Sequence, residues 1–197
     1  MDEELRVLTE RLRVEAATSG VPDAPTAHDR LVATGDHDEL AAVLTEPGQP
    51  LWARELAAFR LGTAGDRRAF ESLVLLLNHR DPPRCAAAAH ALARLGDPRT
   101  ARAAAALATN ELRVAYALHP VRLLVELRAP EAVPALITTL RRRLRPHDPH
   151  RRVALACVEG LGALGDERAG PVLNDALAHP ALAQAAVRAL ARIPGQR

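Results

Sequence analysis

Apolar residues along the chain recur at the three- and four-residue spacing of an amphipathic helix. Val133 and Leu136 show this pattern, which places both on one helical face. Leu8 and Leu12 share a face in the same way, within a helix predicted over residues 2–18. Alanine-rich runs of the same kind fill much of the remaining chain. The pattern therefore predicts an all-α protein.

A recurring Leu-x-x-x-Gly-Asp motif interrupts these runs at a nearly constant interval of about 31 residues. The interval before the last full copy is longer by about six residues, which indicates an insertion there. The copies are LVATGD at 31–36, LGTAGD at 61–66, LARLGD at 92–97, a degraded LVELRA at 124–129, LGALGD at 161–166 and a partial LARIPG at 190–195. A fixed period of this length is typical of repeat proteins.

Each copy of the motif is predicted to join two helices. Its glycine ends the first helix in the left-handed conformation, and its aspartate caps the second helix by accepting hydrogen bonds from free backbone amides. Asp66, Asp97 and Asp166 are the predicted caps. Pro98 would occupy the first helical position, where its missing N–H loses no hydrogen bond. Pro120 lies inside a predicted first helix and should kink or split that helix.

The composition agrees with a helical protein that has a tight core. Hydrophobic residues make up 48% of the chain but aromatic residues only 2%, which disfavours an all-β sandwich or barrel and a disordered chain. Cys85 and Cys157 lie in alanine-rich runs and are predicted to be small buried core residues. All basic residues are arginine, and the formal net charge of +2 lacks the large excess typical of nucleic-acid-binding proteins.

The sequence also bears on the compartment. The N-terminal segment MDEELRVLTERLRVEAA is charged throughout, unlike a signal peptide. No apolar run reaches the roughly 18 residues of a membrane-spanning helix, and the two cysteines suit a reducing environment. A cytoplasmic location without membrane association is therefore expected.

The repeat units resemble the HEAT repeats, specifically the short bacterial form of phycobilisome-lyase-type proteins. The resemblance is carried by DPPRCAAAAHALARLGDPRTARAAAAL at 81–107, EAVPALITTL at 131–140 and DPHRRVALACVEGLGALGDERAGPVLNDAL at 148–177. It implies a right-handed α-α superhelix, a solenoid of about five helix pairs with terminal helices, whose second helices line the concave side. A single domain over 1–197 is expected, with a capping helix in 1–20, helix pairs in 21–179 and a terminal half-repeat in 180–194.

The segment RRRLRPHDPHRR at 141–152 concentrates positive charge more strongly than any other part of the chain. It runs from a predicted helix end through the insertion into the next helix, and only Asp148 lies within it as a local acid. Arginine suits bidentate contacts to anionic groups, whereas such a run can also be a solvated helix end. The predicted partner-binding residues, called the arginine cluster below, are Arg141, Arg142, Arg143, Arg145, Arg151 and Arg152.

Other motifs favour structural roles. His147, Asp148 and His150 bring two imidazoles and a carboxylate together, but no His-x-x-x-His motif and no metal-ligand spacing of cysteines accompanies them. No Gly-rich phosphate loop or G-x-S-x-G motif occurs. We therefore expect no catalytic residue, no cofactor and no metal. Trp52 and Tyr116 are expected to pack against the preceding repeat.

These expectations favour a non-catalytic scaffold or adaptor that binds another protein, one with an acidic surface, through the concave face and the arginine cluster. The main alternative is a nucleic-acid-associated protein related to HEAT-like DNA glycosylases, although the functional residues of that class match no position here. A second alternative is a small biosynthetic or modifying enzyme without a readable motif. A strong salt dependence of binding to duplex DNA would separate the first two.

Overall fold

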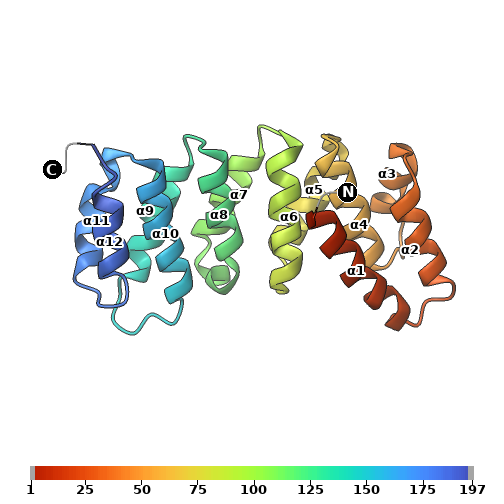
Figure 1. The fold of residues 1–197 in the computed structure, drawn as a ribbon, viewed down its shortest axis with the longest axis horizontal. Coiled ribbons are helices and arrows are strands. Elements are labelled where there is room, and N and C mark those ends of the chain that lie inside the picture. Colours follow the sequence, from red (N-terminus) through yellow and green to blue (C-terminus); the bar gives the residue numbers. More distant parts are fainter. Residues whose placement is uncertain (1–2, 195–197) are drawn as a thin grey trace. The chain divides into compact units, whose positions relative to one another are not determined.

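Helices account for almost all regular structure in this protein. The computed structural model describes residues 3–194, which are 75% helical and contain no strand. Twelve α-helices and three short 3₁₀ helices, labelled η, follow one another along this range (Figure 1). The all-α repeat fold is therefore confirmed, and the helix-pair periodicity agrees with the spacing of the Gly-Asp motifs.

The chain divides into two compact units, Met1–Asp97 and Pro98–Arg197, and each is described by itself. The single domain predicted over residues 1–197 stays a prediction. The helices of the first unit are α1 (Glu3–Thr18), α2 (Ala24–Ala33), α3 (His37–Thr45), α4 (Leu51–Thr63), η1 (Arg67–Ala69), α5 (Phe70–Leu77) and α6 (Pro82–Leu95). The helices of the second unit are α7 (Thr100–Thr109), η2 (Glu111–Tyr116), α8 (Leu118–Leu127), α9 (Ala132–Arg143), α10 (Arg151–Leu164), η3 (Glu167–Ala169), α11 (Gly170–Leu177) and α12 (Ala183–Leu190).

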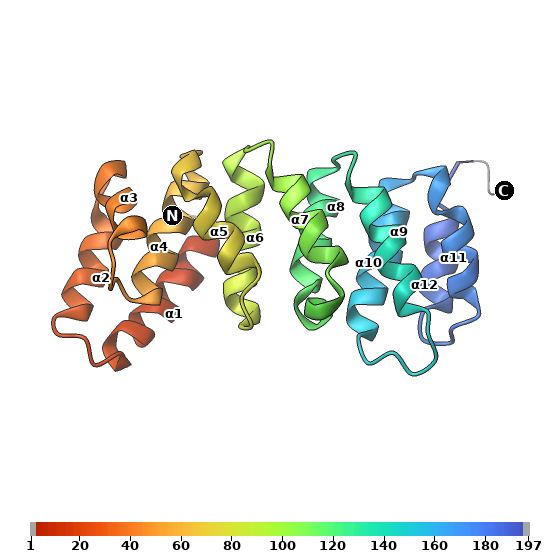
Figure 2. The same cartoon turned by 180° about the vertical axis from the view of Figure 1, so that it is seen from behind.

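Within each unit, helices pack mainly on helices that are close in sequence. In the first unit α1 lies on α2 and α4, while α6 packs on α4 and α5. In the second unit α10 packs on α8, α9 and α12, and α7 packs on α8 and α9. The first helices α8, α10 and α12 form one face of the second unit (Figure 1), and the second helices α7, α9 and α11 form the opposite face (Figure 2).

The motif glycines end helices as predicted at most joints. Gly65, Gly96 and Gly165 have φ angles of 80°, 65° and 69°, in the left-handed region. Arg128, which replaces glycine in the degraded copy, adopts the same conformation with φ 50°. The prediction is wrong at Gly35, because Thr34 already ends α2 in an extended conformation and no left-handed residue is needed. Gly195 of the partial copy lies outside the described residues.

The predicted aspartate caps are present at two of three positions. Asp66 is the N-cap residue of η1 and accepts a hydrogen bond from the backbone N–H of Arg68 at 3.1 Å. Asp166 does the same for η3 through Arg168 at 2.9 Å. The prediction is wrong at Asp97, because the chain turns at Pro98 and Arg99 before α7 begins and Arg99 occupies the N-cap position. Pro98 has no N–H to donate there, and Asp97 is buried.

Pro120 does not kink or split α8, in contrast to the prediction from the sequence. Pro120 is the third residue of α8, a position in the first turn where a backbone donor is not required. The predicted split lies upstream instead, at Arg113, whose non-helical φ and ψ interrupt η2. The α8 helix is therefore short and regular after its start at Leu118.

The core is built from aliphatic side chains and alanine, as the composition indicates. Cys85 and Cys157 are 1% and 0% exposed, in agreement with the prediction that they are core residues. Trp52 is buried against His28 of the preceding helix pair, with ring centroids 6.1 Å apart. Tyr116 is half-buried and carries the guanidinium of Arg113 over its ring at 4.5 Å. Among the described residues, none of the helices is both long and apolar enough to cross a membrane.

Candidate binding site

The arginine cluster spans a helix end, a loop and a helix start in the second unit. Arg141, Arg142 and Arg143 form the last turn of α9, where cations interact favourably with the helix dipole. Arg145 lies in the loop over residues 144–150, while Arg151 and Arg152 begin α10. Cations at a helix start oppose the dipole. Helix electrostatics therefore account for the first three arginines and not for the last two.

Arg142 is engaged in holding α9 to the end of α7. Its Nε lies 2.9 Å from a carboxylate oxygen of Glu111, and its guanidinium donates a hydrogen bond to the backbone carbonyl of Thr109 at 2.7 Å. One turn earlier, the Thr139 hydroxyl donates to the carbonyl of Ala108 at 3.0 Å. The expectation that Asp148 is the local acid is therefore incomplete, because the fold brings Glu111 to the cluster from a distant part of the sequence.

Arg143 has a structural contact as well. Its guanidinium lies 3.0 Å from Asp148, and both side chains are largely buried, at 10% and 11% exposure. The other Asp148 oxygen accepts the backbone N–H of His150 at 2.8 Å, so this carboxylate fixes the loop. Burial raises the pKa of the nearby Cys157 thiol to about 12, which keeps it protonated and unreactive.

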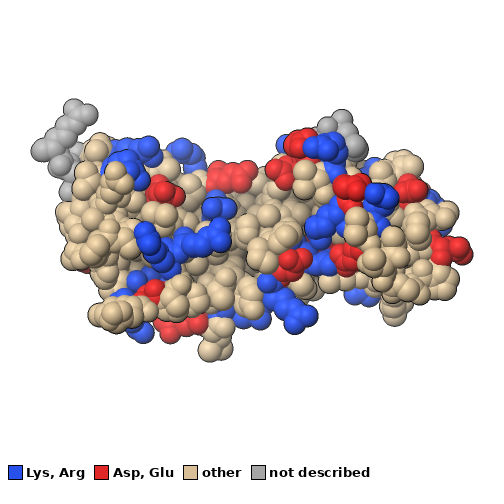
Figure 3. Space-filling view, turned by 60° about the horizontal axis from the view of Figure 1, so that its bottom comes forward, with Lys and Arg blue, Asp and Glu red and all other residues tan. Residues whose placement is uncertain are grey.

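Four arginines of the cluster remain exposed: Arg141, Arg145, Arg151 and Arg152. Within the described residues, no side-chain hydrogen bond or ion pair joins any of them to an acid. Figure 3 shows a band of arginine side chains across the second unit, with acidic side chains at its margins. Of the six arginines that the sequence predicts to bind a partner, two therefore make internal contacts and four are exposed.

A small pocket lies beside these arginines. It has a volume of about 210 Å³ and is formed by the loop over 144–150, the start of α10 and the connection over 178–182. Arg143, Arg145 and Arg151 line it together with His147 and His179. The fold therefore brings His179 to the cluster, a residue that the sequence pattern does not connect with it.

The second-helix face of the same unit contains a shallow groove between α7 and α9. The groove has a volume of about 620 Å³ and a floor of small side chains, including Ala105, Ala106 and Pro134. Arg102 and Glu131 supply opposite charges at its walls. Small residues permit the close approach of another polypeptide, and the charges can orient it.

The first-helix face of the second unit carries further cations. Arg122 and Arg192 surround Glu159 in a pocket of about 320 Å³ over α8, α10 and the end of α12. Burial lowers the pKa of His119, and the nearby cations Arg122 and Arg152 lower it further. Both effects favour the neutral imidazole of His119, and the cations that line this pocket are Arg122 and Arg192.

The candidate metal motif is not assembled. Among the residues that the structure describes, no three or more His, Cys, Asp or Glu side chains are grouped so that they could hold a metal ion. Asp148 of this motif is instead paired with Arg143, as described above. His147 adopts a left-handed conformation with φ 60° at the tip of the loop.

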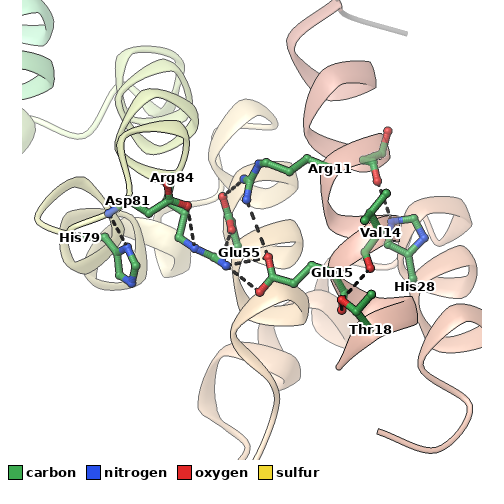
Figure 4. A network of polar contacts seen from close by, with 10 residues as sticks. Arg11, Val14, Glu15, Thr18, His28, Glu55, His79, Asp81 and Arg84 are labelled. Atoms are coloured by element: carbon green, nitrogen blue, oxygen red, sulfur yellow. Dashed lines mark hydrogen bonds and ion pairs between the residues drawn. The ribbon is translucent and has the colours of Figure 1, made fainter. Parts of the chain in front are cut away.

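A buried ion network in the first unit was missed by the sequence reasoning. Glu55 of α4 is 1% exposed and pairs with Arg11 of α1 and Arg84 of α6 (Figure 4). Arg84 also contacts Glu15 at 2.6 Å and Asp81 at 3.3 Å. The available signal was a glutamate among the mostly apolar residues 51–62, because a charge that is buried in such a helix must find a partner. The network joins α1, α4 and α6 and is structural.

A comparison with protein families supports the repeat assignment. The model of the PBS lyase HEAT-like repeat matches residues 153–179, which correspond to α10, η3 and α11. The chain therefore carries a HEAT-like repeat, as the resemblance in its sequence indicates. A comparison with curated proteins finds no match to this chain.

Proposed function

We propose that this protein is a non-catalytic scaffold or adaptor that binds another protein through the second unit. The binding surface comprises the groove between α7 and α9 and the exposed residues of the arginine cluster. One observation carries the proposal: the groove is lined by Thr109, whose carbonyl accepts the hydrogen bond from Arg142, so the groove reaches the last turn of α9, where Arg141 begins the cluster.

The physical basis is a preformed surface with two complementary parts. Helix α9 is tied to α7 by Thr139 and Arg142, so the groove walls are held before a partner arrives. Association with such a surface loses little conformational entropy. The exposed arginines attract an acidic partner and increase the rate of encounter, more at low salt than at high salt.

The experiment uses a variant that fills the groove. Ala106 is exposed and lines the groove, so Ala106→Arg should abolish capture of the partner from host extract without lowering the melting temperature. Ala163→Arg places the same side chain at an exposed alanine of α10, on the first-helix face of the second unit and away from the groove, and serves as the matched control. Equal capture of the partner by both variants and the wild type would refute the proposal that the groove binds the partner.

A second arm tests the charged part and the nucleic-acid alternative. Arg141→Glu with Arg152→Glu removes two exposed cations that make no side-chain hydrogen bond or ion pair among the described residues, so partner binding should weaken most at low salt. Arg142 is unsuitable for this purpose because it contacts Glu111 and Thr109. Tight binding to duplex DNA with a steep salt dependence would instead favour the nucleic-acid alternative.

A further inference from the structure

The pocket beside the loop over 144–150 has an unbalanced charge. Arg145 and Arg151 line it, and within the described range neither makes a side-chain hydrogen bond or ion pair with another residue. Asp148 is the one acid in its lining, and both carboxylate oxygens are already engaged, by Arg143 and by the His150 N–H. The two arginines therefore leave an uncompensated positive charge at the pocket.

The start of α10 adds to this positive potential. Helix α10 is 14 residues long, and its N-cap residue His150 makes no side-chain cap hydrogen bond. Arg151 and Ala154 of its first turn line the pocket. The dipole at a helix start favours an anion, and this helix start lines the same pocket as the two arginines.

The walls of the pocket are fixed from the opposite side. The carbonyl of His179 accepts hydrogen bonds from the backbone N–H groups of Leu182 and Ala183 at 2.8 and 2.9 Å. Leu182 is 4% exposed and anchors this connection in the core. Together with the loop that Asp148 fixes, this holds the backbone on both sides of the pocket.

We propose that this pocket binds a phosphomonoester group. A planar guanidinium contacts phosphate oxygens in bidentate fashion, and two of them with a helix start match a dianion. The volume of about 210 Å³ is smaller than that of typical cofactor sites. None of the residues that line it is Trp, Tyr or Phe, and its aromatic rings are the imidazoles of His147 and His179. The pocket therefore suits a phosphoryl group on a small or extended carrier.

The carrier can be a free metabolite or a phosphorylated side chain of the partner. The second case rests on the proposed function, because it makes the pocket part of the partner-binding surface. Both share the phosphomonoester chemistry, and the test separates them. O-phosphoserine represents the free ligand, while a peptide with one phosphoserine, compared with its unphosphorylated form, represents the protein.

The experiment measures binding of inorganic phosphate and O-phosphoserine to the full chain by calorimetry at constant ionic strength. The test variant is Arg145→Gln with Arg151→Gln, which removes the two unpaired pocket arginines. The matched control is Arg141→Gln with Arg152→Gln, which removes the same charge from the same cluster outside the pocket. Binding should fall at least about tenfold in the test variant and less than about twofold in the control.

The outcomes are distinct. Saturable binding that only the pocket variant loses supports the site, with the peptide arm identifying the carrier. Equal losses of binding in both variants would mean that phosphate is attracted by the overall positive charge of the cluster and not by the pocket, and would overturn the proposal. Absence of saturable binding by the wild type would also overturn it. Ala106→Arg should leave phosphate binding unchanged, so failure of the groove and failure of the phosphate site can be told apart.

Discussion

Replacement of Arg84 by methionine tests whether the buried ion network stabilises the first unit. Arg84 is 8% exposed at its side chain and contacts Glu55, Glu15 and Asp81 from α6. Methionine keeps much of the apolar stem and removes the charge. The buried Glu55 then keeps Arg11 as its one cationic partner within this network. The carboxylates that faced Arg84 lose their shared partner.

The expected cost follows from the burial of this pair. Breaking a buried ion pair by removing one partner costs about 3–5 kcal/mol. Because Arg11 still contacts Glu55 and Glu15 is one-third exposed, we expect a loss near the lower end, about 3 kcal/mol. Arg6→Met is the control, since the Arg6–Glu3 pair is 63% and 69% exposed. Its removal should leave stability unchanged within error.

The loss should also depend on pH. Burial raises the pKa of Glu55, and the cations Arg11 and Arg84 oppose this rise. With Arg84 removed, the folded-state pKa of Glu55 moves further above its ordinary value of 4.5. A carboxyl group whose pKa is raised by folding contributes stability at low pH and loses it as the pH rises through the folded-state value. The Arg84→Met defect should therefore be larger at about pH 8 than at about pH 5.

Urea unfolding followed by tryptophan fluorescence is the suitable assay. Trp52 is the single tryptophan of the chain and is buried in the first unit, so its emission reports this unit and not the second. An Arg84→Met variant with wild-type stability, or with a defect independent of pH, would refute the reasoning. The first result would mean that the network contributes no net stability, and the second that Glu55 does not carry the penalty.

Two further predictions concern the second unit and are read by thermal melts followed by circular dichroism. A Cβ at Gly162 would lie 2.7 Å from the backbone Cα of Ala189. Gly162→Ala should therefore push α10 away from α12 and lower the free energy of unfolding by about 1–3 kcal/mol. Gly35→Ala in the first unit is the control and should be tolerated, because a Cβ there would meet no atom within 4 Å. Asp166→Ala should cost about 0.5–2 kcal/mol at neutral pH. Hydrogen bonds from Arg168 lower the pKa of Asp166 to about 2. The stability that the Asp166 cap contributes should therefore persist in mild acid and be lost as the pH falls through about 2. An Asp166→Ala defect that disappears near pH 4 would contradict this prediction.

The repeat architecture was readable from the sequence because its determinants are local. A left-handed residue ends a helix through contacts within one turn, so Gly65, Gly96 and Gly165 reveal the joints, and Arg128 follows the same geometry without glycine. The capping aspartates Asp66 and Asp166 act within two residues. The cap prediction fails at Asp97 because residues 98 and 99 form a turn before α7, so that Arg99 takes the N-cap position.

The helical segments, the repeat joints and the accumulation of arginine could be predicted from the sequence, since each depends on neighbours along the chain. Which of those arginines are exposed and which are paired depends on the folded structure. Glu111 and Thr109 reach Arg142 from a preceding segment, and Arg143 is buried with Asp148. The same holds for Glu55, whose partners lie 44 and 29 residues away in sequence. Pairing of charges depends on distance in space and on desolvation, and neither quantity is encoded in the spacing of residues along a helix.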